Sequence, residues 1–227
     1  MTAREARIRA HIEKLCNGDV VARRRAERWL FRYGQDAVPL LAKACKFGSP
    51  QTRAHAVWVL GLIGGPEAFD AILTLSHDPD EQVRYDARWA LGLTHDPRAA
   101  DILFGLAESC DADDVGSEWY GIRELGPTVL ERLLDLSLGP DQKLAVPSIY
   151  ELGQTGDPKA LPVLAEALRS EDSRRRLAAV EALGVIGGND ALGLLQTALD
   201  DPDDQVRSSA QLSFEEAAAT IPGPPNT

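Results

Sequence analysis

Four histidines are the residues of this chain best suited to metal binding or acid–base catalysis: His11, His55, His77 and His95. A protein metal site needs imidazole, thiolate or carboxylate ligands that recur at close spacing. None of the four histidines lies in a His-Glu pair or in a His-Glu-x-x-His motif. His77 and His95 each precede an aspartate, but they stand 18 residues apart, where turns between helices are expected. We therefore predict no metal, no cofactor and no catalytic residue.

The residues that could do covalent or phosphate chemistry also lack a supporting pattern. Cys16, Cys45 and Cys110 lie far apart without a Cys-x-x-Cys pair, so we expect reduced and mostly packed thiols. The sequence contains no Gly-x-Ser-x-Gly, P-loop or Gly-x-Gly-x-x-Gly motif. Its paired glycines, such as Gly64 and Gly65, instead mark turns.

Composition narrows the class of protein further. The formal charge of −11 disfavours binding to nucleic acid or to an anionic membrane. Apolar residues make up 44% of the chain and aromatic residues only 6%, which favours a core of Ala, Leu, Val and Ile between closely packed helices. We see no apolar run long enough to span a membrane and no secretory signal in the charged first ten residues. We expect a cytoplasmic protein.

A repeat of 31 residues organises the chain and must position any functional side chain. In each copy a leucine is followed by glycine and then by a short turn. These leucines, which we call the anchors, are Leu60, Leu91, Leu152 and Leu183. Trp29 fills the anchor position one period before Leu60, and Phe214 fills it one period after Leu183. Leu125 is the best candidate for the anchor of an irregular repeat in the gap.

Each repeat is predicted to be a hairpin of two helices. The first helix carries apolar residues at helical spacing, as in Val83, Ala87 and Leu91, and the second begins near a proline or aspartate, as at Pro66. A single hairpin cannot bury both faces, so neighbours must stack. The predicted hairpins are about 19–47, 49–77, 80–109, 114–138, 141–170 and 172–200, with end helices at 2–16 and 203–219. We expect one domain at 1–219 and a disordered tail at 220–227.

Two stretches carry a family resemblance. They are Asp80-Glu-Gln-Val-Arg84, followed by Ala87 and Ala90-Leu91-Gly92, and Asp203-Asp-Gln-Val-Arg207. In order and spacing they resemble the HEAT-like repeats of the phycobilisome-lyase type, over roughly residues 19–216. The resemblance implies an all-α, right-handed α-α superhelix of about six helical hairpins with capping helices at both ends. Iron-binding hydroxylases built on similar repeats use repeated His-Glu pairs, and this chain departs from that pattern at every histidine.

A row of arginines recurs seven residues before the anchor position. It consists of Arg53, Arg84, Arg176 and Arg207, and it is interrupted in the irregular and fifth repeats by Glu118 and Ala145. We predict that these arginines neutralise helix ends and tie adjacent units together. The alternative is a row that binds anions.

Two further sets of residues are candidates for binding a partner. The aromatic set lies two residues before the anchors and consists of Trp58, Trp89 and Tyr150. Stacked repeats would align the two tryptophans on the layer of first helices, either as a binding hot spot or as rings that complete the packing. The acidic set lies on the second helices and consists of Asp70, Asp101, Glu131, Asp135 and Glu166. It would line an acidic inner groove suited to a basic peptide, or it is an ordinary solvated face.

These features predict a non-enzymatic scaffold or adaptor that binds a protein or peptide, possibly a basic one, rather than nucleic acid or membrane. Two alternatives stay open. The family resemblance implies a chromophore-handling subunit similar to bilin lyases. A nucleic-acid-binding protein of HEAT-like architecture is the other, with Trp119, Arg123 and Arg132 as the nearest candidates for its site.

Overall fold

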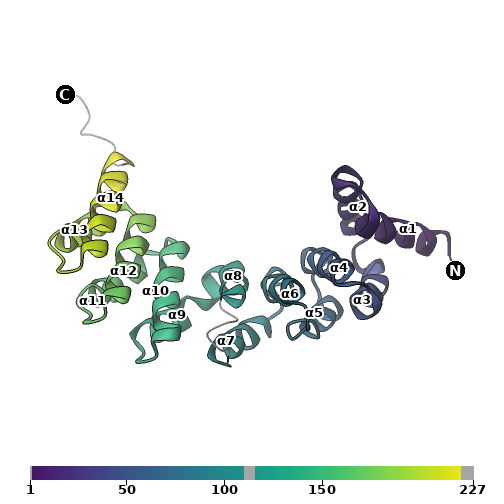
Figure 1. Cartoon of the computed structure of the whole chain (residues 1–227), viewed down its shortest axis with the longest axis horizontal. Coiled ribbons are helices and arrows are strands. Elements are labelled where there is room, and N and C mark those ends of the chain that lie inside the picture. Colours follow the sequence, from purple (N-terminus) through teal and green to yellow (C-terminus); the bar gives the residue numbers. More distant parts are fainter. Residues whose placement is uncertain (1, 110–115, 221–227) are drawn as a thin grey trace. The chain divides into compact units, whose positions relative to one another are not determined.

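The computed structural model describes residues 2–109 and 116–220, and within these ranges the chain is built from α-helices and short 3₁₀ turns (Figure 1). The all-α fold predicted from the repeat is therefore confirmed. The chain forms two compact units, Met1–Leu125 and Gly126–Thr227, which we call unit 1 and unit 2. The single domain expected at 1–219 stays a prediction. No helix among the described residues is long and apolar enough to cross a membrane.

Helices lie close to the boundaries of the predicted hairpins, but the predicted hairpin 114–138 is divided between the two units. Those of unit 1 are α1 (Ala3–Asn17), α2 (Val20–Tyr33), α3 (Val38–Phe47), α4 (Pro50–Ile63), α5 (Pro66–Leu73), α6 (Glu81–Leu93), α7 (Ala99–Ser109) and α8 (Ser117–Glu124). Those of unit 2 are α9 (Leu130–Leu138), α10 (Gln142–Thr155), α11 (Leu161–Ala167), α12 (Ser173–Ile186), α13 (Gly188–Ala198) and α14 (Asp204–Thr220). Most of the predicted tail 220–227 lies outside the described residues, and its first residue ends α14.

Side-chain caps explain where many of these helices begin. A short oxygen-bearing side chain just before the first turn accepts a hydrogen bond from a backbone N–H that has no partner inside the helix. Thr2 caps α1 in this way, with a distance of 3.1 Å between the Glu5 nitrogen and the Thr2 hydroxyl oxygen. Asp80 caps α6 through the Val83 nitrogen at 3.1 Å. The same motif recurs at Asp19, Ser49, Asp141 and Asp172.

The anchors form the centre of the core. Leu60, Leu91, Leu152 and Leu183 are fully buried, and Leu125 is 8% exposed. The first repeat departs from the predicted register. Leu30 is fully buried there, whereas the predicted anchor Trp29 is 46% exposed. The reason is that α2 packs chiefly against α1, which also contacts α4, so α2 does not sit against α4 as the later first helices sit against one another.

Glycine allows the first helices of neighbouring repeats to approach closely. The residue after each anchor is glycine in these repeats, and a methyl group built on Gly153 would lie 2.5 Å from the Cα of Ala182. In the irregular repeat the contact shifts along the chain, because Gly92 meets Gly121 rather than a residue next to the anchor Leu125. A methyl group on Gly92 would lie 2.0 Å from the Gly121 carbonyl oxygen. The short helix α8 therefore packs on α6 about one turn out of the regular register.

In the turn that follows the anchor, the residue four positions after the anchor must adopt a positive φ angle. Glycine provides it at Gly64, Gly156 and Gly187, with φ between 64° and 69°. His95 occupies the same position with φ of 50°, and it is the one described non-glycine residue with positive φ. Its place in an exposed turn confirms the interpretation of His95 as a turn residue.

Two arginines of the row hold the loops that flank their own hairpins, and the predicted tie between adjacent units stays a prediction. Arg53 binds both carboxylate oxygens of Asp78 at 2.8 and 2.5 Å, and Arg176 binds Asp201 in the same way at 2.8 and 3.0 Å. In each case an arginine on the first helix of a hairpin holds the loop that follows its second helix. The Arg176 hydrogen bond lowers the pKa of Asp201, with the backbone N–H of Asp203 contributing further. We call these two ion pairs the clamps.

Candidate functional site

The four histidines lie on separate elements and form no common site. His11 is on α1, His55 on α4, and His77 and His95 follow α5 and α6. Among residues 2–109 and 116–220, no group of three or more His, Cys, Asp or Glu side chains is placed to hold a metal ion.

A serine beside a histidine is the closest approach to a catalytic pair. The Ser76 hydroxyl lies 3.0 Å from Nδ1 of His77, but Ser76 is fully buried and its hydroxyl donates to the Leu73 carbonyl at 2.9 Å. A nucleophile must be reachable by its substrate. The pair is therefore a local support for the turn after α5.

Two histidines sit in the contact between α1, α2 and α4. Burial lowers the pKa of His11, and Lys14 adds to the effect. Burial also lowers the pKa of His55, with the charge of Arg23 adding to it. His11 Nδ1, His55 Nε2 and Arg23 Nε have no hydrogen-bond partner among the described residues. Burial thus favours the neutral form of both imidazoles, which act as packing groups.

The described cysteines are free thiols, as expected. Cys45 is buried on α3, and this burial raises its pKa to about 12, although the charge of Arg53 opposes the shift. A thiol with such a pKa carries almost no thiolate at neutral pH. Cys16 is partly exposed, and Cys110 lies outside the described residues.

Four aromatic rings on α4, α6 and α8 form one continuous surface cluster. We call Trp58, Tyr85, Trp89 and Tyr120 the aromatic cluster. The Trp58 and Trp89 rings meet edge to face with centroids 5.1 Å apart, and Tyr120 lies 5.8 Å from Trp89 and 5.7 Å from Tyr85. Tyr120 is 41% exposed and the other three rings are partly exposed. The two tryptophans thus stack on the layer of first helices, where their position two residues before the anchors placed them.

Two members of this cluster were missed by sequence reasoning. Tyr85 stands one helical turn before Trp89, so spacing of four residues on one helix could have found it. Tyr120 reaches Trp89 only because α8 is packed out of register, which the repeat pattern does not show. Trp119, considered for nucleic-acid binding, is 8% exposed and packs edge to face on Phe104.

Carboxylates border the aromatic cluster. The Trp89 indole N–H donates to Glu124 at 3.1 Å, and Arg123 lies over the Tyr120 ring at 5.5 Å. Asp86 is half-buried, and burial raises its pKa although the Gln82 amide opposes the shift. Aromatic faces beside carboxylates suit a cationic or amphipathic ligand group.

The predicted acidic set is exposed throughout but divided between the units. In unit 1 Asp70 lies on α5 and Asp101 on α7, and Arg98 neutralises Asp70 through an ion pair of 2.8 Å. The members in unit 2 are Glu131 and Asp135 on α9 and Glu166 on α11. Tyr150 is also in unit 2, on α10, and is 39% exposed. A continuous acidic groove stays a prediction.

Sequence comparison finds enzymes among the relatives. Deoxyhypusine hydroxylases from Rattus norvegicus and Mus musculus are each 44% identical to this chain over 66 residues, which is 28% of this chain and 22% of the relative. The expectations of a non-enzymatic scaffold and of no enzymatic role are therefore wrong. The sequence analysis could not predict a likeness to enzymes from the repeats, because proteins with the same fold can have unrelated functions.

Three solved structures show how far the likeness extends. Human deoxyhypusine hydroxylase is 21% identical, with 95% of this chain and 97% of that chain covered and a TM-score of 0.43. The CpcE–CpcF complex of phycocyanin lyase from Nostoc is 20% identical, with coverage of 92% and 94% and a TM-score of 0.45. YibA of Escherichia coli is 16% identical, with coverage of 95% and 97% and a TM-score of 0.50. The YibA likeness supports the fold alone.

The repeat itself gives the broadest match. The HEAT repeat family matches residues 9–92, 38–118 and 127–215, which together include most of both units. The matched stretches contain the anchors Leu60, Leu91, Leu152 and Leu183, whereas most of α8 lies between two of them. The chain belongs to the HEAT repeat family.

Proposed function

We propose that this chain is part of an enzyme that acts on a protein or peptide, and that the aromatic cluster binds the substrate. The aromatic cluster is the observation that carries the proposal. Four partly exposed rings from three consecutive helices form a rigid apolar surface, and tryptophan and tyrosine are the side chains most often found at binding hot spots. The identity with hydroxylases over 66 residues supports the enzymatic role.

The surroundings of the aromatic cluster suggest the kind of segment that it would bind. Glu124 accepts a hydrogen bond from the Trp89 indole, and Asp86 lies close enough to Tyr85 to add to the rise in pKa that burial causes there, so carboxylates lie beside the rings. A lysine or arginine side chain can lie across an aromatic ring and reach a carboxylate at its edge. The proposed substrate is therefore a protein segment with a cationic side chain, modified in the cytoplasm.

The test compares modified peptides in cells. Whole-proteome mass spectrometry would be carried out on the wild-type strain, a strain lacking the gene, and a strain carrying Trp58→Ala/Trp89→Ala. A strain carrying Phe47→Ala/Leu212→Ala serves as the matched control, because both residues are large, apolar, exposed and not members of the aromatic cluster. Circular dichroism of each purified variant confirms that the helices are retained.

We expect a covalent modification that is present in the wild type and in the control strain, and lost in the other two. A modification that depends on the gene but survives the double tryptophan substitution would remove the aromatic cluster from substrate binding. If the deletion strain shows the same modified peptides as the wild type, the chain does not act on proteins.

A further inference from the structure

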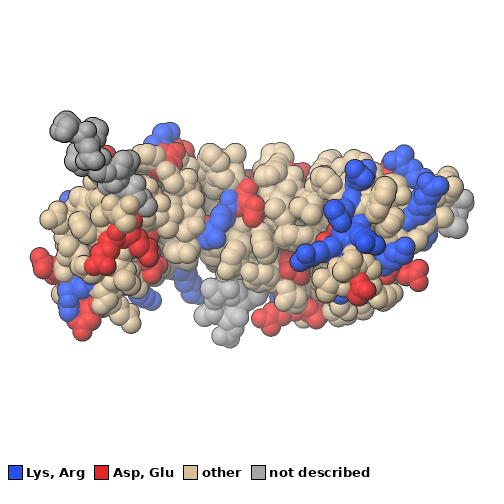
Figure 2. Space-filling view, turned by 90° about the horizontal axis from the view of Figure 1, so that it is seen from above, with Lys and Arg blue, Asp and Glu red and all other residues tan. Residues whose placement is uncertain are grey.

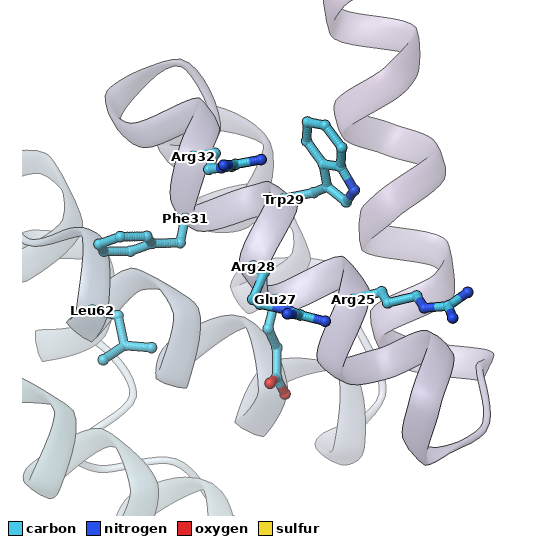
Figure 3. Close-up of a pocket in the computed structure, with 7 residues that line it drawn as sticks. All are labelled: Arg25, Glu27, Arg28, Trp29, Phe31, Arg32 and Leu62. Carbon is cyan, nitrogen blue, oxygen red and sulfur yellow. The ribbon is translucent and has the colours of Figure 1, made fainter.

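We infer that α2 and α4 form a second binding site, a basic groove that takes an acidic protein segment. The groove has a volume of about 690 Å³ and is lined by Arg25, Glu27, Arg28, Trp29, Phe31, Arg32 and Leu62 (Figure 3). Its residues are distinct from the aromatic cluster, and the inference does not rest on the proposed function.

The groove exists because the first repeat is packed differently from the others. α1 contacts α2, α3 and α4, and α2 contacts α4 less than α4 contacts α6. Large apolar side chains are left at the surface there. Trp29 is 46% exposed, Phe31 55% and Leu62 42%. Figure 3 shows Phe31 and Leu62 beside each other at one end, with Trp29 and Arg25 toward α1.

The N-terminal helices concentrate positive charge in an otherwise acidic chain. Residues 1–46 contain eleven Lys and Arg against five Asp and Glu, whereas residues 47–227 contain thirteen against thirty. Figure 2 shows these basic side chains gathered over the end of unit 1 that holds α1 and α2. The net charge of −11 conceals this segregation, which is why composition alone did not predict a basic site.

Several of these cations are uncompensated. Arg25 and Arg28 are exposed and form no ion pair with any residue in the described ranges 2–109 and 116–220. Arg32 stacks over the Trp29 ring at 5.4 Å, and Trp29 in turn stacks on His11 at 5.9 Å. The aromatic side of the groove is thus held in place, while two guanidinium groups remain available for planar contacts with carboxylates.

The mixture of groups favours an acidic protein over a nucleic acid. Phe31 and Leu62 offer apolar surface that a sugar–phosphate backbone cannot use, and Glu27 repels phosphate within the groove itself. The charge of residues 47–227 further opposes the approach of a long polyanion. A segment in which Asp or Glu alternates with a large apolar residue satisfies both sides of the groove.

The test measures binding of a defined probe by fluorescence anisotropy. The probe is a fluorescein-labelled peptide of alternating Glu and Phe, compared with the same peptide carrying Gln for Glu and with a labelled single-stranded oligonucleotide. The site variant is Arg25→Glu/Arg28→Glu. The control is Lys143→Glu/Lys159→Glu, which changes the net charge equally at exposed positions in unit 2.

We expect the full chain to bind the acidic peptide more weakly as salt rises, and the site variant to lose at least about tenfold in affinity. The control should stay within about twofold, and the Gln peptide should bind poorly to every protein. Equal binding by the site variant and the wild type, or no binding by the wild type, would overturn the inference. Preference for the oligonucleotide that is lost in the site variant would assign the groove to nucleic acid. Self-association of the wild type in sedimentation, abolished by Arg25→Glu/Arg28→Glu, would assign it to a second copy.

Discussion

Replacing Gly92 by alanine should destabilise unit 1, whereas the same replacement at Gly105 should stabilise it. Both glycines lie inside helices, α6 and α7, so alanine gains about 1 kcal/mol of helix propensity at each. At Gly92 the new methyl group would lie 2.0 Å from the Gly121 carbonyl oxygen, a backbone atom that cannot rotate away. Overpacking of this kind costs about 3 kcal/mol. At Gly105 no heavy atom outside its own helix turn lies within 4 Å, so no such cost arises.

The net effects are a loss of about 2 kcal/mol for Gly92→Ala and a gain of about 1 kcal/mol for Gly105→Ala. At about 3–4 °C per kcal/mol for a unit of this size, the two variants should melt roughly 10 °C apart. All four tryptophans of the chain lie in unit 1, so tryptophan fluorescence during urea or thermal unfolding reports on this unit. A Gly92→Ala protein as stable as the wild type would refute the close approach of α6 and α8.

Three further predictions follow from the same structure. His95→Gly should stabilise unit 1 by about 1 kcal/mol, measured by thermal unfolding, because the turn requires a left-handed residue there. Arg88→Met should lower the free energy of unfolding in urea by about 3 kcal/mol, because it removes the guanidinium that lies 3.5 Å from the buried Glu118 carboxylate. The double variant Arg88→Met/Glu118→Leu removes both charges and should be nearly neutral. Equal losses in the two variants would contradict this account. The pKa values of His11 and His55 are lowered in the folded state, so their contribution to the stability of unit 1 is complete above the unfolded pKa of 6.5 and is lost as the pH falls through the folded pKa. The melting temperature of unit 1 should therefore drop as the pH falls below 6.5. His11→Phe/His55→Leu should make the melting temperature depend less on pH in that range.

The repeat period was enough to predict most of the helices and the buried anchors, because stacking forces the same buried position wherever the neighbour is another repeat. Leu60, Leu91, Leu152 and Leu183 therefore report directly on the core. The predicted anchor was wrong in the first repeat, where the neighbouring helix does not belong to another repeat. α2 has α1 beside it instead of another repeat, so Leu30 rather than Trp29 is buried, and a side chain expected in the core became part of the surface groove.

The candidate sites were less predictable than the fold, because they depend on contacts across repeats. Trp58 and Trp89 could be placed side by side from spacing alone, and their rings do meet. Tyr120 could not, since it joins them only through the shifted packing of α8. The likeness to deoxyhypusine hydroxylases over 66 residues could not be predicted from motifs, because a repeat architecture is shared by proteins of unrelated function.

The clamps have a consequence for the order in which the chain folds during synthesis. Each one joins a hairpin to the loop directly after it, since Arg53 and Asp78 are 25 residues apart and so are Arg176 and Asp201. A short loop costs little entropy to close, and contacts between near neighbours form quickly. The ion pair can therefore form as soon as its own hairpin has emerged, before the next repeat exists to stack on it. The next helix can then pack on a hairpin that is already folded, so that each repeat folds while the chain is still being synthesised.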